Sequence, residues 1–202
     1  MENKQVLKLV ITDFISVNHY LGYRAIVKNE KPMAVSYKTP EAKKFQEEFT
    51  EYVKKQAEIQ NWEKDLNPYQ HYYVDVVFYF PRIDMDCNNY WKVPFDSITD
   101  AGNVWLDDNM ACERVKKVMY DSKNPRIEYE IYKTDFIGIF DTQNQLCDFE
   151  NKCKNCKRYS RNCSILNKAK EGRIQDEINS EFVCSKYKEV QHACTHGKYV
   201  KS

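Results

Sequence analysis

Side chains with oxygen atoms that could bind a metal gather in two short stretches near the middle of the chain. The first stretch follows a strongly apolar run, and the second comes one predicted helix later. Their members are Asp84, Asp86, Asn88 and Asn89 in the first, and Asp107 and Asp108 in the second. Carboxylate and amide oxygens are hard ligands that suit Mg²⁺ or Mn²⁺ better than a soft metal. Acidic stretches are also common on solvated surfaces, so composition leaves a metal site and an exposed acidic face both open.

The segment between the two stretches has the pattern of an amphipathic helix. Lys92 falls on the face opposite the apolar one, which predicts that its amine points toward the first acidic stretch. A proline is tolerated only in a first helical turn, so Pro94 predicts that the helix either begins near Trp91 or is kinked there. Gly102 is expected to end it. The predicted apolar face consists of Trp91, Pro94, Phe95 and Ile98.

Three motifs in this region together resemble the active-site segment of the RusA family of Holliday junction resolvases. That family reads Asp-x-Asp-Asn-x-x-Lys, then an Asp on the following helix, then Trp-x-Asp-Asp. The matching segments are Asp86-Cys87-Asn88-Asn89-Tyr90-Trp91-Lys92, Phe95-Asp96 and Val104-Trp105-Leu106-Asp107-Asp108. The resemblance covers residues 6–132. It includes Asn18-His19-Tyr20 after the first predicted strand and Tyr37-Lys38-Thr39-Pro40 before the first predicted long helix.

The resemblance implies that Asp86 and Asp108 bind catalytic Mg²⁺ or Mn²⁺, with Lys92 beside them and Asp107 as a further candidate. In the ungapped register Asn88 stands where the family has its second Asp. A slip of two residues would instead make Asp84-Met85-Asp86 the Asp-x-Asp pair. We favour the ungapped register because it preserves the spacing to Lys92 without an insertion.

The residues before the acidic stretches predict two strands and a helix. Residues 5–15 alternate and are rich in β-branched side chains, which predicts a first strand. Residues 17–36 lose this periodicity and are predicted to form a long loop. Its basic and aromatic side chains suit either contact with nucleic acid or a solvated loop. Thr39 and Pro40 are typical of a helix N-terminus, and Tyr69–Phe80 is typical of a central buried strand.

Two alternating segments follow the second acidic stretch. Residues 113–120 and 126–133 flank a turn-forming sequence, which predicts a β-hairpin. Arg114, Lys116 and Lys117 in this segment suit either a basic rim near the site or an ordinary solvated strand face. The fold class that these elements predict is α/β, a mixed sheet flanked by helices, as the RusA resemblance also implies.

The chain changes composition after Phe140, and six of its eight cysteines lie between Cys147 and Cys194. Four of them, Cys153, Cys156, Cys163 and Cys184, predict a structural Zn²⁺ site that would give a small module its folding energy. An iron–sulfur cluster or unpaired thiols are the alternatives. We therefore expect an endonuclease domain over residues 1–140 and a cysteine-rich module over 141–202. His192, Cys194 and His196 could add ligands, but we expect this terminus to be disordered.

The overall composition suits one core of ordinary size and a small second unit, in a chain of 202 residues with a net charge of +1. A DNA-binding surface would therefore have to be a local patch. We find no signal peptide or membrane segment and expect a cytoplasmic protein with no membrane partner.

The RusA resemblance implies a homodimeric, Mg²⁺-dependent endodeoxyribonuclease of phage or prophage origin, acting in a bacterial host on four-way junctions in recombination and repair. A non-catalytic DNA-binding or replication-accessory protein, in which the cysteine module makes the main contact, is the alternative function.

Overall fold

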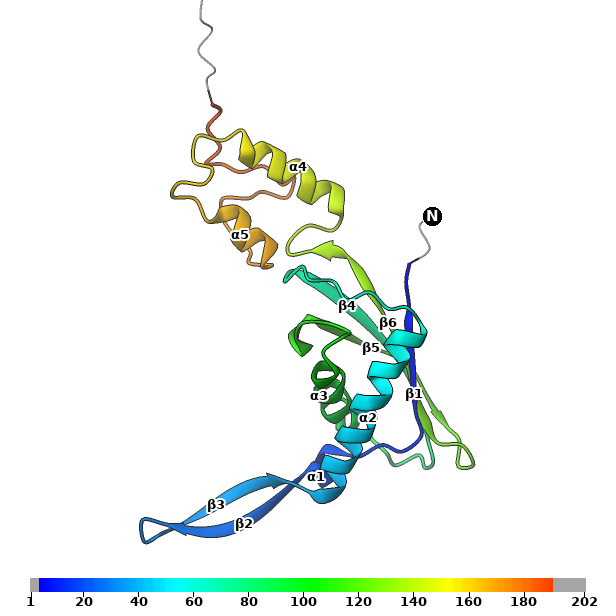
Figure 1. The fold of residues 1–202 in the computed structure, drawn as a ribbon. Coiled ribbons are helices and arrows are strands. Elements are labelled where there is room, and N and C mark those ends of the chain that lie inside the picture. Colours follow the sequence, from blue (N-terminus) through cyan, green and yellow to red (C-terminus); the bar gives the residue numbers. More distant parts are fainter. Residues whose placement is uncertain (1–3, 191–202) are drawn as a thin grey trace, which may run out of the picture. The chain divides into compact units, whose positions relative to one another are not determined.

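The computed structural model describes residues 4–190 of the chain (Figure 1). His192, Cys194 and His196 lie outside the described residues. The chain forms two compact units, which divide between Thr134 and Asp135.

The first unit is built on a four-stranded sheet in the order β1-β6-β4-β5. Its strands are β1 (Leu7–Ile11), β4 (Gln70–Phe80), β5 (Ala111–Tyr120) and β6 (Arg126–Ile137). Strands β1 and β6 pair antiparallel, whereas β4 and β5 pair parallel. The sheet is therefore mixed, as predicted, and the strand predicted to be central, β4, lies between two others.

Helices α2 (Pro40–Ile59) and α3 (Lys92–Ala101) share the hydrophobic core with this sheet (Figure 1). Alternate residues of β4 are fully buried because they face these helices. As predicted, Thr39 caps α2, and Gly102 ends α3 in the left-handed conformation with φ 76°. The buried side chains from these elements include Phe49, Val53, Val74, Val76, Phe78, Phe95 and Ile98.

The predicted hairpin over residues 113–133 is wrong. Both strands exist, but β4 lies between β5 and β6 in the sheet. The turn between them passes the end of β4, where the Asp121 N–H donates to the Phe80 carbonyl at 2.8 Å. Alternation predicts that a segment is a strand but carries no information on which strand it pairs with.

The predicted long loop over residues 17–36 is also wrong. The segment forms a short helix, α1 (Val17–Tyr20), and an antiparallel hairpin of β2 (Leu21–Lys28) and β3 (Lys31–Lys38). Strand β1 is shorter than the predicted residues 5–15, and ends at Ile11. The hairpin makes a sheet of its own (Figure 1).

Up to residue 190, the second unit contains two helices, α4 (Gln143–Lys154) and α5 (Ile165–Lys170), together with turns and isolated bridges. A capping box at Thr142 starts α4. The Phe140 ring packs against Phe149 and Phe182, with both centroid distances at 5.3 Å. The other buried apolar side chains among the described residues of this unit are Ile137, Leu146, Ile165 and Ala169. Across residues 4–190, no helix is long and apolar enough to cross a membrane.

Candidate active site

The first acidic stretch lies where the chain leaves β4 and enters a short 3₁₀ helix, η1 (Cys87–Tyr90). Asp86 caps this helix, and its Oδ1 accepts a hydrogen bond from the Asn88 N–H at 2.9 Å. Asp84 instead forms an ion pair with Arg82 at 3.1 Å, and both side chains are largely exposed. The Asp86 carboxylate is thus held by a backbone N–H of η1, whereas the Asp84 carboxylate pairs with the Arg82 guanidinium.

The second acidic stretch begins a 3₁₀ helix, η2 (Asp108–Met110), directly before β5. Asp107 caps it by accepting a hydrogen bond from the Asn109 N–H at 3.0 Å. The preceding Trp105 is buried, and its Nε1–H donates to Thr99 Oγ1 on α3 at 2.8 Å. This buried indole fixes the acidic stretch to the helix that carries Lys92.

The second stretch is a crowded group of carboxylates with one nearby cation. Partial burial raises the pKa of Asp108, and the neighbouring carboxylates of Asp107 and Asp96 raise it further, while Lys92 opposes the rise. Lys92 Nζ lies 3.2 Å from Asp96 Oδ1. Burial also raises the pKa of Glu113, with a further contribution from Asp108. A divalent cation bound here would offset this mutual repulsion.

The predicted residues Asp107, Asp108 and Lys92 therefore lie within electrostatic reach of one another. Among the described residues, no hydrogen bond or ion pair joins Asp84, Asp86 or the Asn88 side chain to this group. Nor is any set of three or more His, Cys, Asp or Glu side chains in residues 4–190 arranged to hold a metal ion. The oxygen donors fit Mg²⁺ or Mn²⁺ by their chemistry.

Two carboxylates near Asp108 had no predicted role. Asp96 belongs to the Phe95-Asp96 segment of the family resemblance and follows Lys92 by one helical turn, but it was not assigned as a site residue. Glu113 is the third residue of β5, where alternation indicated only an ordinary strand residue. Its proximity to Asp108 depends on the turn made by η2, which the sequence pattern does not reveal.

A hydrogen-bonded set of side chains links this group to α1 and α2. The Tyr20 hydroxyl donates to Asp96 Oδ2 at 3.3 Å. One turn further along α3, Asp100 accepts from Gln46 Nε2 at 2.7 Å. Lys38 Nζ in turn donates to Gln46 Oε1 at 2.7 Å. These contacts fix the orientation of the exposed face of α3, and with it the position of Asp96.

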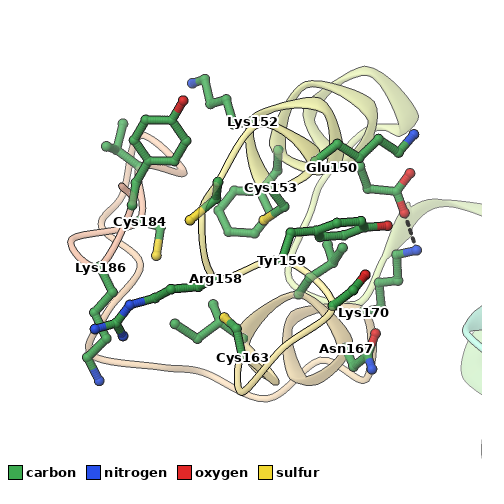
Figure 2. Close-up of a pocket in the computed structure, with 18 residues that line it drawn as sticks. Glu150, Lys152, Cys153, Arg158, Tyr159, Cys163, Asn167, Lys170, Cys184 and Lys186 are labelled. Atoms are coloured by element: carbon green, nitrogen blue, oxygen red, sulfur yellow. Dashed lines mark ion pairs between the residues drawn. The ribbon is translucent and has the colours of Figure 1, made fainter. Parts of the chain in front are cut away.

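In the second unit, the four predicted cysteines line one cavity of about 690 Å³. Figure 2 shows the sulfur atoms of Cys153, Cys163 and Cys184 turned toward its interior. Cys153 comes from the end of α4, and Cys184 from a segment that pairs with Ile178 through an isolated bridge. The seven cysteines among the described residues are all free thiols.

The environment of these thiols differs from one to the next. Burial raises the pKa of Cys153 to about 11, and the nearby Cys184, Cys163 and Cys156 add to the rise. Burial acts in the same direction on Cys156, but backbone N–H groups, led by that of Lys188, outweigh it and lower the Cys156 pKa. The Lys188 N–H donates to Cys156 Sγ at 3.4 Å. Four thiols around one cavity fit Zn²⁺ by their chemistry, although among the described residues no three of them are arranged to hold a metal ion.

A comparison with models of protein families identifies a family that this chain matches. The family model of endodeoxyribonuclease RusA matches residues 22–132 of this chain. The match includes all of the β2–β3 hairpin except its first residue, together with α2, α3 and both acidic stretches. It ends within the first unit and does not extend to the cysteine cavity. A comparison with curated proteins gives no match.

Proposed function

Because the chain belongs to the RusA family of endodeoxyribonucleases, we propose that it is a Mg²⁺-dependent enzyme that resolves four-way DNA junctions by paired phosphodiester hydrolysis. The family assignment identifies a nuclease of the Holliday junction resolving type, which acts on branched DNA. We propose in addition the identity of the metal, the residues that bind it and the pairing of the two cuts.

The observation that carries the proposal is the crowding of carboxylates around Asp108. The carboxylates of Asp107 and Asp96 raise the pKa of Asp108, and a bound divalent cation would offset their repulsion. We assign Asp86 and Asp108 as the principal ligands of Mg²⁺ or Mn²⁺, with Asn88 and Asp107 next to them. Asp84 takes part only if the register of the first stretch is slipped.

Phosphodiester hydrolysis requires an activated water and relief of the negative charge that grows on the phosphoryl and leaving oxygens. Bound Mg²⁺ would supply both as a Lewis acid. The ammonium of Lys92 is placed beside the same carboxylates, where it stabilises charge on the phosphoryl oxygens. Asp96 keeps that ammonium at the site, and the Tyr20 hydroxyl in turn orients Asp96.

Symmetric resolution requires two equivalent active sites that face two related strands. A homodimer with a two-fold axis meets this requirement, and we therefore propose a dimer. Recombination and repair in the bacterial cytoplasm are the settings in which such a reaction is used.

For the second unit we propose a structural Zn²⁺ site formed by Cys153, Cys156, Cys163 and Cys184. All four side chains line one cavity, and their thiol chemistry supports the proposal. The apolar cluster around Phe140 is small, so a metal would contribute much of the folding free energy of this unit. On this view residues 1–140 form the endonuclease domain and residues 141–202 a zinc module.

The test is cleavage of an immobile four-way junction with labelled strands, in parallel with a flap and a linear duplex. Paired nicks across the junction, dependent on Mg²⁺ or Mn²⁺, would support the enzyme. Tight binding of the junction without any cleavage in either metal would instead support the non-catalytic DNA-binding alternative.

A further inference from the structure

The β2–β3 hairpin is a two-stranded sheet of its own, and no other described strand pairs with it. It begins directly after Tyr20 and returns at Thr39, whose N–H donates to the Tyr20 carbonyl at 3.0 Å. A two-stranded hairpin without a third strand is marginally stable in water. A partner that covers its side chains would therefore stabilise it.

Cross-strand pairing sorts the side chains of the hairpin onto two faces, because directly opposed residues point to the same side. We call these the apolar face and the basic face. The apolar face carries Leu21, Tyr23, Ala25, Val27, Pro32 and Ala34, with Ser36 and Lys38 at its base. The basic face carries Arg24, Lys28 and Lys31, together with Gly22, Ile26, Met33, Val35 and Tyr37.

The apolar face is open to solvent at its largest side chains. Tyr23 is 73% exposed and Val27 is 76% exposed. Such exposure of an aromatic and a branched side chain on one face is typical of a surface that contacts another molecule.

The basic face indicates what kind of molecule that is. Lys28 and Lys31 stand directly opposite each other in the pairing register, and like charges in this position destabilise a hairpin. They flank a turn in which Asn29 and Glu30 both have positive φ, at 53° and 62°. Positive φ at both positions is the usual geometry of a two-residue hairpin turn, and it holds the two lysines opposite each other. A polyanion would relieve the repulsion between the two lysines.

The hairpin starts beside the candidate active site. Tyr20, the residue before β2, donates its hydroxyl to Asp96, and Asp96 pairs with Lys92. The hairpin therefore begins next to a residue that contacts Asp96, one of the carboxylates near Asp108. A polyanion whose phosphate is at that group lies within reach of the hairpin.

We propose that the β2–β3 hairpin is a DNA-contacting arm of the enzyme. Its basic face binds phosphates of one duplex arm of the substrate, and Tyr23 and Val27 pack against bases that are unstacked at the branch point. Two-stranded ribbons fit into DNA grooves, and apolar side chains on such elements separate base steps. The identity of the polyanion as branched DNA rests on the proposed function.

The first test changes the charge of the basic face in the full-length protein. Lys28→Gln with Lys31→Gln removes two cations, and Lys54→Gln with Lys55→Gln removes two from α2 as a matched control. Junction binding is measured by fluorescence anisotropy without Mg²⁺ over a series of salt concentrations. We expect the slope of log affinity against log salt to fall by roughly 1.8 in the hairpin variant, and to stay unchanged in the control.

The second test removes the apolar contacts. Tyr23→Ala with Val27→Ala should weaken binding to a four-way junction about tenfold while leaving a linear duplex unaffected, since only the junction offers unstacked bases. A 2-aminopurine at the branch point should lose its response to the protein. Ile59→Ala with Leu66→Ala, two other exposed apolar residues, is the control. All these side chains are at the surface, so tryptophan fluorescence should report unchanged folding.

Separate outcomes identify which proposal fails. If the wild-type protein cuts junctions and both hairpin variants bind and cut like it, the arm proposal is wrong and the proposed function stands. If the wild-type protein binds junctions through the hairpin but never cuts them, the arm proposal stands and the proposed function is wrong. Loss of a dimer in the Tyr23 and Val27 variant, with DNA binding unchanged, would show that a second copy occupies the hairpin, and would also overturn the proposal.

Discussion

Arg114 donates a hydrogen bond through its Nε to Asp75 Oδ1 at 2.6 Å, which ties β5 to β4 on the sheet face away from the core of α2 and α3. The Tyr132 hydroxyl donates to the other oxygen at 3.0 Å, and Lys116 lies 3.6 Å from it. Arg114 and Lys116 are therefore engaged with a buried carboxylate, which accounts for their presence in β5 without a role in a basic rim.

This relationship predicts a pH-dependent contribution to stability. Burial alone would raise the pKa of Asp75, but Arg114 and Tyr132 outweigh it and the pKa is lowered. A carboxyl whose pKa is lower in the folded state stabilises the protein above its unfolded pKa and loses that effect as pH falls through the folded value. We expect Asp75→Asn to cost about 2 kcal/mol at pH 7, and progressively less as the pH falls below the ordinary range of an aspartate pKa.

Urea unfolding followed by tryptophan fluorescence measures this effect, because Trp62, Trp91 and Trp105 are the three tryptophans of the chain and all lie in the first unit. Glu130→Gln is the matched control, since its ion pair with Lys8 is exposed and should contribute little. Equal losses in the two variants at pH 7 would contradict the assigned role of Asp75.

Replacing the proposed metal ligands should separate cleavage from binding. Asp86→Asn and Asp108→Asn are each expected to lower the rate of junction cleavage at least about a hundredfold. Binding without metal should be unchanged or tighter, because a carboxylate that repels phosphate has been removed. Single-turnover cleavage and anisotropy measure the two effects. Asp148→Asn, an exposed carboxylate on α4, is the control, and normal turnover in either ligand variant would refute the site.

The register of the first acidic stretch makes a sharper prediction. Asp86 is fixed by the Asn88 N–H, whereas Asp84 is paired with Arg82. With the ungapped register, Asp84→Asn should be nearly silent, and Asn88→Asp should lower the Mg²⁺ concentration needed for half-maximal cleavage, because a charged oxygen replaces a neutral one. Metal titrations of these variants and of Asn88→Ala decide between the registers. An inactive Asp84→Asn with a mild Asn88→Ala would establish the slipped one.

The cysteine cavity predicts about one Zn²⁺ per chain in protein purified without chelator. Cys184→Ser should lose the metal, and Cys147→Ser, an exposed thiol outside the cavity, should retain it. Chelation should increase hydrogen exchange after Asp135 while leaving tryptophan fluorescence unchanged, since the first unit has its own core. Elemental analysis is the primary measurement. A brown sample that contains iron would contradict the zinc assignment and would indicate an iron–sulfur cluster instead.

Much of the first unit could be predicted from the sequence, because its signals are local. The cap at Thr39, the stop at Gly102 and the buried run of β4 each depend on a few neighbouring residues. The pairing of β5 with β4 instead of β6 could not be predicted, because the partner of a strand depends on contacts between distant segments. For the same reason the proximity of Glu113 to Asp108 was not found.

The β2–β3 hairpin was missed for a different reason. Two-residue turns with positive φ at both positions are usually recognised by Asn-Gly, and here Glu30 occupies the place of the glycine. The flanking strands also lack the alternation of a half-buried sheet, since both of their faces are largely exposed. A segment that buries little gives a weak hydrophobic pattern even when it is a regular strand.

The most direct test of the central claim is a time course of cleavage on an immobile four-way junction with each strand labelled in turn. We expect nicks in two opposing strands, at symmetric positions, that appear together and require Mg²⁺ or Mn²⁺ and an intact Asp108. The linear duplex should remain uncut. Cleavage of a single strand, cleavage that persists in Asp108→Asn, or equal cleavage of junction and duplex would each contradict the account.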